Sequence, residues 1–306
     1  MTIFFKKNNR LSFFLLLSFL LFQIGCQEKN SSSPVGAPSG PDAPSTPVIY
    51  AGTGHGLSIS TDGGVSFVNK TTADGLGYYY VSSVHVSGST IYAGAYGSQG
   101  GGLSISTDGG VSFVHRTTVG GRNQVMSAYV SGSTIYAGTG GSGLSISTDG
   151  GVSFVTKTTD DGLGYNHVYG VYVSGSTIYA ATGGGGLSIS TDSGASFVNK
   201  TTADGLGDND VRSVYVSGST VYAATFVSGL SISTDGGETF VNKTTADGLG
   251  SNMVVGVYAS GGTIYAATYG GLSISTNGGA SFVNKTTADG LGRNDVLSVY
   301  VSGAGI

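Results

Sequence analysis

The sequence is poor in charge, cysteine, proline and tryptophan. Charged residues make up 10% of its 306 residues, tryptophan is missing, and Cys26 is its one cysteine. The net charge is only -4, and the nine lysines and arginines after Pro47 stand singly along the chain. Nucleic acids and anionic membrane surfaces are bound by clustered basic residues. We therefore expect no nucleic-acid partner.

The plentiful residues indicate β-structure. The chain holds 55 glycines and 18 tyrosines, a composition typical of short strands joined by tight turns. All five prolines fall between Pro34 and Pro47, so none interrupts the sequence that follows. We expect an all-β domain over residues 47–306.

The first 25 residues have the order of an export signal. Lys6, Lys7 and Arg10 precede an apolar run over residues 11–24. A run of about 14 residues is shorter than the roughly 20 that cross a bilayer as a helix, and basic residues before an apolar core are typical of a signal peptide. We predict that residues 1–25 are removed after export.

Residues 22–26, Phe-Gln-Ile-Gly-Cys, resemble the lipobox of bacterial lipoproteins. The resemblance implies that Cys26 becomes the lipidated first residue and anchors the protein to a membrane. Gln23 stands where the motif usually has an aliphatic residue, which leaves cleavage without lipidation as the alternative. Residues 26–46, rich in proline, serine and glycine, predict an extended tether. We expect a location in the bacterial cell envelope, on the outer membrane or cell surface or facing the periplasm.

From Val48 onward, one pattern recurs with a period of about 43 residues. In the copy at residues 211–243, four strand-like segments follow one another: VRSVYVSG, STVYAAT, GLSISTDGG and ETFVNK. We call them strands A, B, C and D. Four-stranded units that recur about every 40 to 50 residues are typical of β-propeller blades.

The number of copies predicts a six-bladed ring. Strand A begins at Val81, Val125, Val168, Val211, Val254 and Val296, and strand B begins at Val48, Thr90, Thr134, Thr177, Thr220 and Thr263. We predict that residues 296–302 pair with residues 48–51, which completes the first blade and removes free sheet edges. The alternative is a larger ring cut short, because residues 303–306 read as the start of another strand B.

Each copy carries Ser-x-Asp/Asn-x-Gly-x-Ser/Thr-Phe between strands C and D. These segments resemble the Asp-box, or bacterial neuraminidase repeat, of sialidases and many non-enzymatic propellers. An aspartate beside glycines can accept backbone N–H bonds within its own turn, and the asparagine of the sixth copy keeps the acceptor without the charge. We predict a structural role at Asp62, Asp108, Asp149, Asp192, Asp235 and Asn277.

A second motif, Asp-Gly-Leu-Gly-x-Asn-x-Val, leads from strand D into the next strand A, as at residues 247–254. With strand-B segments such as residues 263–271, it resembles the propeller repeat of two-component-regulator sensor domains. Both resemblances imply the propeller fold over residues 48–302. They do not imply one function, because propellers host unrelated activities.

A sialidase-like glycoside hydrolase is the enzymatic alternative. The resemblance would require three arginines, a tyrosine nucleophile paired with a glutamate, and an acidic proton donor. Glu238 is the one glutamate after residue 47, and it stands in a C–D hairpin. Without a carboxylate beside it, a tyrosine with a pKa near 10 is a poor nucleophile. The domain's arginines are Arg116, Arg122, Arg212 and Arg293, and we expect a binding protein, not an enzyme.

No constellation for a metal ion stands out. His55, His85, His115 and His167 are spread over separate repeats, and residues 208–210 lack the ligand count of a calcium loop. We expect no metal ion, no cofactor and a monomer.

The six copies differ mainly in the D–A and B–C loops, which share one face in an up-and-down blade. Aromatic rings beside charged and amide groups can stack on sugars or grip a protein loop. The alternative is that these loops vary because nothing constrains them. The predicted ligand face consists of Tyr78, Tyr79, Tyr80, Tyr96, Arg122, Tyr165, His167, Asp208, Phe226, Tyr269 and Arg293.

We therefore predict a lipid-anchored binding or adhesion scaffold of the cell envelope that presents this face to a glycan or a protein. An assembly factor for an envelope complex is a further alternative, for which the sequence carries no separate mark.

Overall fold

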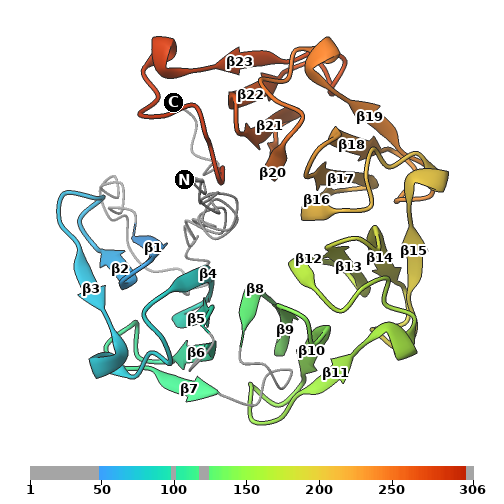
Figure 1. Cartoon of the computed structure of the whole chain (residues 1–306). Helices are drawn as coiled ribbons and strands as arrows, with labels where there is room; N and C mark the ends of the chain where they lie inside the picture. Colours follow the sequence, from blue (N-terminus) through green and yellow to red (C-terminus); the bar gives the residue numbers. More distant parts are fainter. Residues whose placement is uncertain (1–47, 98–100, 117–123, 301–306) are drawn as a thin grey trace, which may run out of the picture.

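The computed structural model describes residues 48–97, 101–116 and 124–300, which fold as a ring of six β-sheets (Figure 1). Cys26, Arg122, the predicted signal peptide and the predicted tether lie outside the described residues. Figure 1 shows the strand A segments β4, β8, β12, β16 and β20 nearest the centre of the ring, with strand D of each blade at its circumference. This arrangement confirms the prediction of a six-bladed β-propeller.

The first sheet has three strands, and the other five have four antiparallel strands in the order A, B, C, D. The first consists of β1 (Ile49–Thr53), β2 (Gly56–Ser60) and β3 (Val68–Lys70). The others are β4 (Val81–Ser87), β5 (Thr90–Ala95), β6 (Gly102–Ser106) and β7 (Val114–Arg116); β8 (Val125–Ser131), β9 (Thr134–Thr139), β10 (Leu144–Ser147) and β11 (Val155–Lys157); β12 (Val168–Ser174), β13 (Thr177–Thr182), β14 (Leu187–Ser190) and β15 (Val198–Lys200); β16 (Val211–Ser217), β17 (Thr220–Thr225), β18 (Gly229–Ser233) and β19 (Val241–Lys243); and β20 (Val254–Ser260), β21 (Thr263–Thr268), β22 (Gly271–Ser275) and β23 (Val283–Lys285).

The two ends of the ring are built differently. The A–B and C–D hairpins lie at one end, which we call the turn end, and the B–C and D–A loops lie at the other, the loop end. Most D–A loops begin with a 3₁₀ turn, such as η4 (Thr245–Asp247), which is capped by Thr244 and ends at Gly248 with φ of 98°. The asparagine of the loop motif is structural as well, because Asn252 Oδ1 accepts a hydrogen bond from Thr245 N at 2.8 Å. The other turns are η1 (Thr72–Asp74), η2 (Thr159–Asp161), η3 (Thr202–Asp204) and η5 (Thr287–Asp289).

The predicted closure of the first blade does not form within the described residues. Residues 296–300 carry no strand and residues 301–306 lie outside the description, so the first sheet stops at three strands. The segment nevertheless follows β20 as an inner strand would. Val296 N donates to Thr268 O at 2.9 Å, and the rings of Tyr258 and Tyr300 have centroids 5.0 Å apart. The pairing with residues 48–51 stays a prediction.

The hydrophobic core lies between neighbouring blades, where period-two alternation buries one face of each sheet against the next. Leu187 of β14 packs in one cluster with Val211 and Val221 of the next blade, and none of the three is exposed. Burying each such side chain stabilises the fold by about 1.5–3 kcal/mol.

The fifth residues of the six strand A segments form an arc of aromatic side chains around the axis: His85, Tyr129, Tyr172, Tyr215, Tyr258 and Tyr300. Successive centroids lie 4.8 to 5.1 Å apart. Burial, with the neighbouring Tyr172, raises the pKa of Tyr129 to about 12. His85 departs from the series, because burial lowers its pKa to about 4 and leaves it neutral at pH 7.

Candidate functional site

The C–D turns use their acidic side chains internally. Ser106 Oγ donates to Asp108 Oδ1 at 2.7 Å and accepts a hydrogen bond from Gly110 N at 2.8 Å. The carboxylate also accepts bonds from the N–H and hydroxyl of Ser112, at 3.0 and 2.6 Å. The sixth turn repeats the pattern, with Asn277 accepting from Ser281 N at 3.0 Å. Each turn is therefore stabilised by its own side chains.

These hydrogen bonds keep the carboxylates ionised. Bonds from the Ser66 hydroxyl, the Ser66 N–H and the Ser60 hydroxyl lower the pKa of Asp62 to about 2. Corresponding side-chain bonds lower the pKa of Asp108, Asp149, Asp192 and Asp235. A carboxyl group that is ionised at neutral pH is a turn acceptor and a poor proton donor.

The loop end receives one extra side chain from each inner strand through a β-bulge. In β12 the register shifts between Val168 and Gly170, which makes Tyr169 the extra residue opposite β13. A bulge turns such a side chain out of the regular alternation. The equivalent residues of the other inner strands are Ser82, Met126, Arg212 and Val255.

Arg212 is held between two aromatic rings at this end. Its guanidinium carbon lies 4.2 Å from the ring centroid of Tyr169 and 3.9 Å from that of Phe226. Its Nη2 donates to Asp210 Oδ2 at 2.7 Å, and the arginine side chain is only 13% exposed. Stacking and the charge-assisted bond fix the plane of the guanidinium.

His167, from the loop that leads into β12, adds a further ring to this group. Its ring centroid is 4.4 Å from that of Tyr169. Burial, followed by the charge of Arg212, lowers the pKa of His167, while Asp210 opposes the shift, so the imidazole is neutral at pH 7. We call His167, Tyr169, Asp210, Arg212 and Phe226 the mouth cluster.

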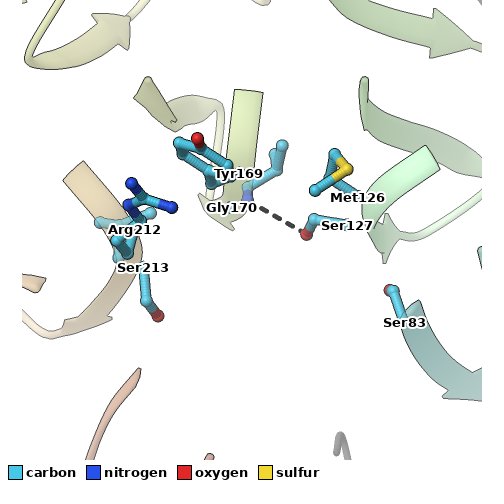
Figure 2. Close-up of a pocket in the computed structure, with 9 residues that line it drawn as sticks. Ser83, Met126, Ser127, Tyr169, Gly170, Arg212 and Ser213 are labelled. Atoms are coloured by element: carbon cyan, nitrogen blue, oxygen red, sulfur yellow. Dashed lines mark hydrogen bonds between the residues drawn. The ribbon is translucent and has the colours of Figure 1, made fainter. Parts of the chain in front are cut away.

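A cavity of about 40 Å³ lies beside the mouth cluster in the inner wall of the ring (Figure 2). Tyr169 and Arg212 line it together with Ser127, Gly170 and Ser213. The dashed line in Figure 2 marks the hydrogen bond from Val171 N to Ser127 Oγ, 3.3 Å long. The volume suits one or two water molecules or one small polar group.

Several predicted face residues meet near this cluster. Burial is the main cause that raises the pKa of Tyr169, and the nearby Tyr96 and Tyr165 add to it. Tyr165 is 51% exposed. Of the predicted face residues, His167 and Phe226 thus belong to the mouth cluster, and Tyr96 and Tyr165 act on the pKa of its Tyr169.

A second aromatic group lies on the D–A loop that leads into β4. The rings of Tyr78 and Tyr79 stack with centroids 4.2 Å apart, and their hydroxyls are 3.1 Å apart. Tyr80 lies edge-on to Tyr96 at 6.2 Å, which links this group to the mouth cluster.

The remaining predicted residues have other contacts. Asp208 accepts a hydrogen bond from Asp210 N at 3.0 Å and so shapes its own loop. Arg293 is 78% exposed and pairs with Asp295. Tyr269 N donates to Met253 O at 3.2 Å.

Sequence reasoning missed Tyr169 and Arg212 as site residues because it looked for variation in loops, and both stand inside strand A. The signal was nevertheless present. At this one strand position the six copies have Ser82, Met126, Tyr169, Arg212, Val255 and Leu297.

Among the residues that the structure describes, the candidates for a sialidase-like set lie at different ends of the ring. Glu238 lies at the turn end, is 75% exposed and bonds to Lys200 at 2.7 Å, whereas Arg212 lies at the loop end. Within residues 48–97, 101–116 and 124–300, no three His, Cys, Asp or Glu side chains gather as metal ligands. The same part of the chain contains no helix long and apolar enough to span a membrane.

No protein-family model and no curated protein matches the sequence. Solved structures do resemble it. The extracellular domain of a hybrid two-component system from B. thetaiotaomicron is 17% identical with a TM-score of 0.68, over 81% of this chain and 34% of that one. YCF48 from Cyanidioschyzon merolae is 14% identical with a TM-score of 0.57, over 82% and 84%.

A GH74 enzyme from Niastella koreensis is 19% identical with a TM-score of 0.56, over 81% of this chain and 37% of that one. This chain thus spans about a third of the length of the two-component extracellular domain and of the GH74 enzyme. At these identities the likeness concerns the propeller fold alone.

Proposed function

We propose that this chain is an exported binding scaffold of the cell envelope, anchored through a lipid on Cys26, which presents the loop end of the ring to a glycan or a protein. The convergence of variable residues at this end supports the proposal. The turn end repeats one self-bonded turn in every blade, whereas at the loop end the mouth cluster brings together side chains from two blades.

The chemistry of the mouth cluster favours binding over catalysis. Asp210 is paired with Arg212, and Glu238, the one glutamate after residue 47, lies at the opposite end of the ring, where it cannot activate a tyrosine of the cluster. Aromatic rings beside fixed polar groups are the usual composition of a recognition site. A protein partner is the second candidate ligand, because a solved structure with this fold is that of YCF48 bound to D1 peptide.

The test compares the two ends of the ring. Replacing Tyr78, Tyr79 and Tyr80 by alanine should weaken the binding of glycans on an array, or of envelope proteins in a pull-down, about tenfold or more. The reason is that tyrosines covered by a bound partner are frequent binding hot spots.

The matched control replaces three exposed valines at the turn end by alanine: Val65, Val111 and Val152, which are 88%, 69% and 69% exposed. This variant should bind as the wild type does. Equal loss in both variants, or no loss in the tyrosine variant with its circular dichroism unchanged, would refute the loop end as the binding face.

A further inference from the structure

Two residues of the mouth cluster, His167 and Asp210, each have a buried polar atom that no described residue bonds. His167 Nε2 and Asp210 Oδ1 have no hydrogen-bond partner among the described residues. Gly183 lies between the two residues, because its N–H donates to His167 O at 2.9 Å and it forms a β-bridge with Asp210. Buried polar atoms in folded proteins are nearly always bonded, so this place has capacity for a ligand.

The chemistry of these atoms selects a neutral ligand that bears hydroxyl groups. A carboxylate oxygen only accepts hydrogen bonds, whereas a neutral imidazole nitrogen donates or accepts according to its tautomer. A hydroxyl group can satisfy either atom, since it donates and accepts. The ion pair between Asp210 and Arg212 cancels the local charge, which removes the attraction for an anion.

The surroundings match a sugar ring in shape. The cavity beside Gly170 has room for a group of the size of a hydroxymethyl. Tyr165, two residues before His167 in the same D–A loop, is 51% exposed and supplies a flat aromatic face. A pyranose presents an apolar C–H face and a rim of hydroxyl groups, which fit these two features together.

We propose that the loop end between β12 and β16 is a subsite for a neutral glycan, whose hydroxyl groups bond to His167 and Asp210 and whose hydroxymethyl group enters the cavity beside Gly170. This inference rests on the proposed function, because it names the ligand class of the same face.

The first test replaces the carboxylate by an amide and the imidazole by an apolar ring, with little change in the size of either side chain. Isothermal titration calorimetry of the folded domain should find at least one ligand among four neutral tetrasaccharides, built from glucose, xylose, mannose or N-acetylglucosamine respectively. Asp210→Asn and His167→Phe should each lower the affinity for that ligand by about 10- to 100-fold, which is the loss expected when a hydrogen bond to a charged or buried group is removed. Asp295→Asn changes the equivalent residue of the last repeat and is the matched control.

The second test fills the cavity with a residue that the repeat already uses. Gly170 occupies the strand A position at which other copies have Ser83 and Ser127, and an added Cβ would meet its nearest neighbours at 3.4 Å, an ordinary contact. The Gly170→Ser variant should therefore fold, and its affinity for the sugar should be lower than that of the wild type. Gly256→Ser, whose Cβ meets the same 3.4 Å contacts away from Arg212, should not lower the affinity.

The outcomes separate this inference from the proposed function. Binding of a neutral glycan that is lost in Asp210→Asn and Gly170→Ser, and kept in both controls, supports it. Unchanged binding in those variants, binding of acidic sugars alone, or capture of a peptide alone overturns the glycan subsite and leaves the binding scaffold standing. Wild type that binds none of the four sugars indicates that only water occupies the site, which overturns the inference. If the wild type binds neither a glycan nor a protein through the loop end, both the inference and the proposed function are overturned.

Discussion

The turn end and the loop end of the ring are built from the same six repeats, yet they differ in how their polar groups are satisfied. At the turn end, Asp108 accepts bonds from Ser106 and Ser112 of its own turn. At the loop end, Arg212 lies between rings from two blades, and Asp210 retains a buried oxygen without a bond among the described residues.

The difference shows how a repeat protein separates stability from recognition. Groups bonded within one turn can be copied without change, because each copy brings all of its partners. Groups bonded across blades depend on what the neighbouring copy supplies, so they can diverge one blade at a time. Exceptions at either end therefore give the sharpest tests of this division.

The largest expected effect concerns His85, which stands where the other blades have tyrosine in the arc of aromatic side chains. Its pKa is about 4 in the folded protein and near 6.5 when unfolded, so between these values only the unfolded state binds the proton. The free energy of unfolding should then fall with decreasing pH by about 1.4 kcal/mol per pH unit and about 3 kcal/mol in total. His85→Tyr should remove this part of the pH dependence in urea unfolding series at pH 7 to 4.

The control for that series is His55→Tyr, a change at an exposed loop position, which leaves the contribution of His85 in place. Equal slopes for the wild type and His85→Tyr would show that burial of the imidazole does not penalise its charge.

The second prediction compares the two ends within one blade. Ser147→Ala removes the hydroxyl that donates to Asp149 and accepts from Gly151 N, both at 2.8 Å. Because the N–H of Gly151 is buried, its loss of a partner should lower the free energy of unfolding by about 1–3 kcal/mol. Ser142→Ala, in the loop-end connection of the same blade, should change it by less than about 0.5 kcal/mol. Similar values for both would erase the distinction between the ends.

The third prediction makes the mouth cluster more like its neighbour. Arg212→Val introduces the residue type found at position 255 and removes the stacking and the pairing with Asp210. Urea denaturation should show a loss of about 1 kcal/mol, typical of a partly exposed cation–π and ion-pair contact. Arg293→Val, at a 78% exposed ion pair, is the control and should be nearly neutral; a gain of stability from Arg212→Val would mean that the cluster is strained for binding.

The smallest expected effect lies in the fourth C–D turn. Ser193 has φ of 60°, where the other turns have glycine, and a left-handed backbone costs a residue with a Cβ about 1–2 kcal/mol. Ser193→Gly relieves this strain, but glycine loses more entropy on folding. The net stabilisation should be about 0.5 kcal/mol and should raise the thermal midpoint. Ser176→Gly, at a position without positive φ, should not stabilise.

The sequence predicted the strand boundaries closely because six copies average out local ambiguity. The inner strands begin at Val81, Val125, Val168, Val211 and Val254, the residues from which strand A was expected to start. It did not predict the bulges, since a period-two pattern looks the same whether or not one residue lies outside the ladder. For this reason Tyr169 and Arg212 were missed.

The sequence by itself determined the repeat, the number of blades and the self-bonded C–D turns, because every interaction that defines them recurs within about 43 residues of chain. Only the tertiary structure decided which variable side chains meet. Tyr169 and Arg212 come from neighbouring blades, and their contact depends on ring curvature and on the bulges that displace both side chains from the regular alternation. Those are properties of packed sheets, which no single repeat contains.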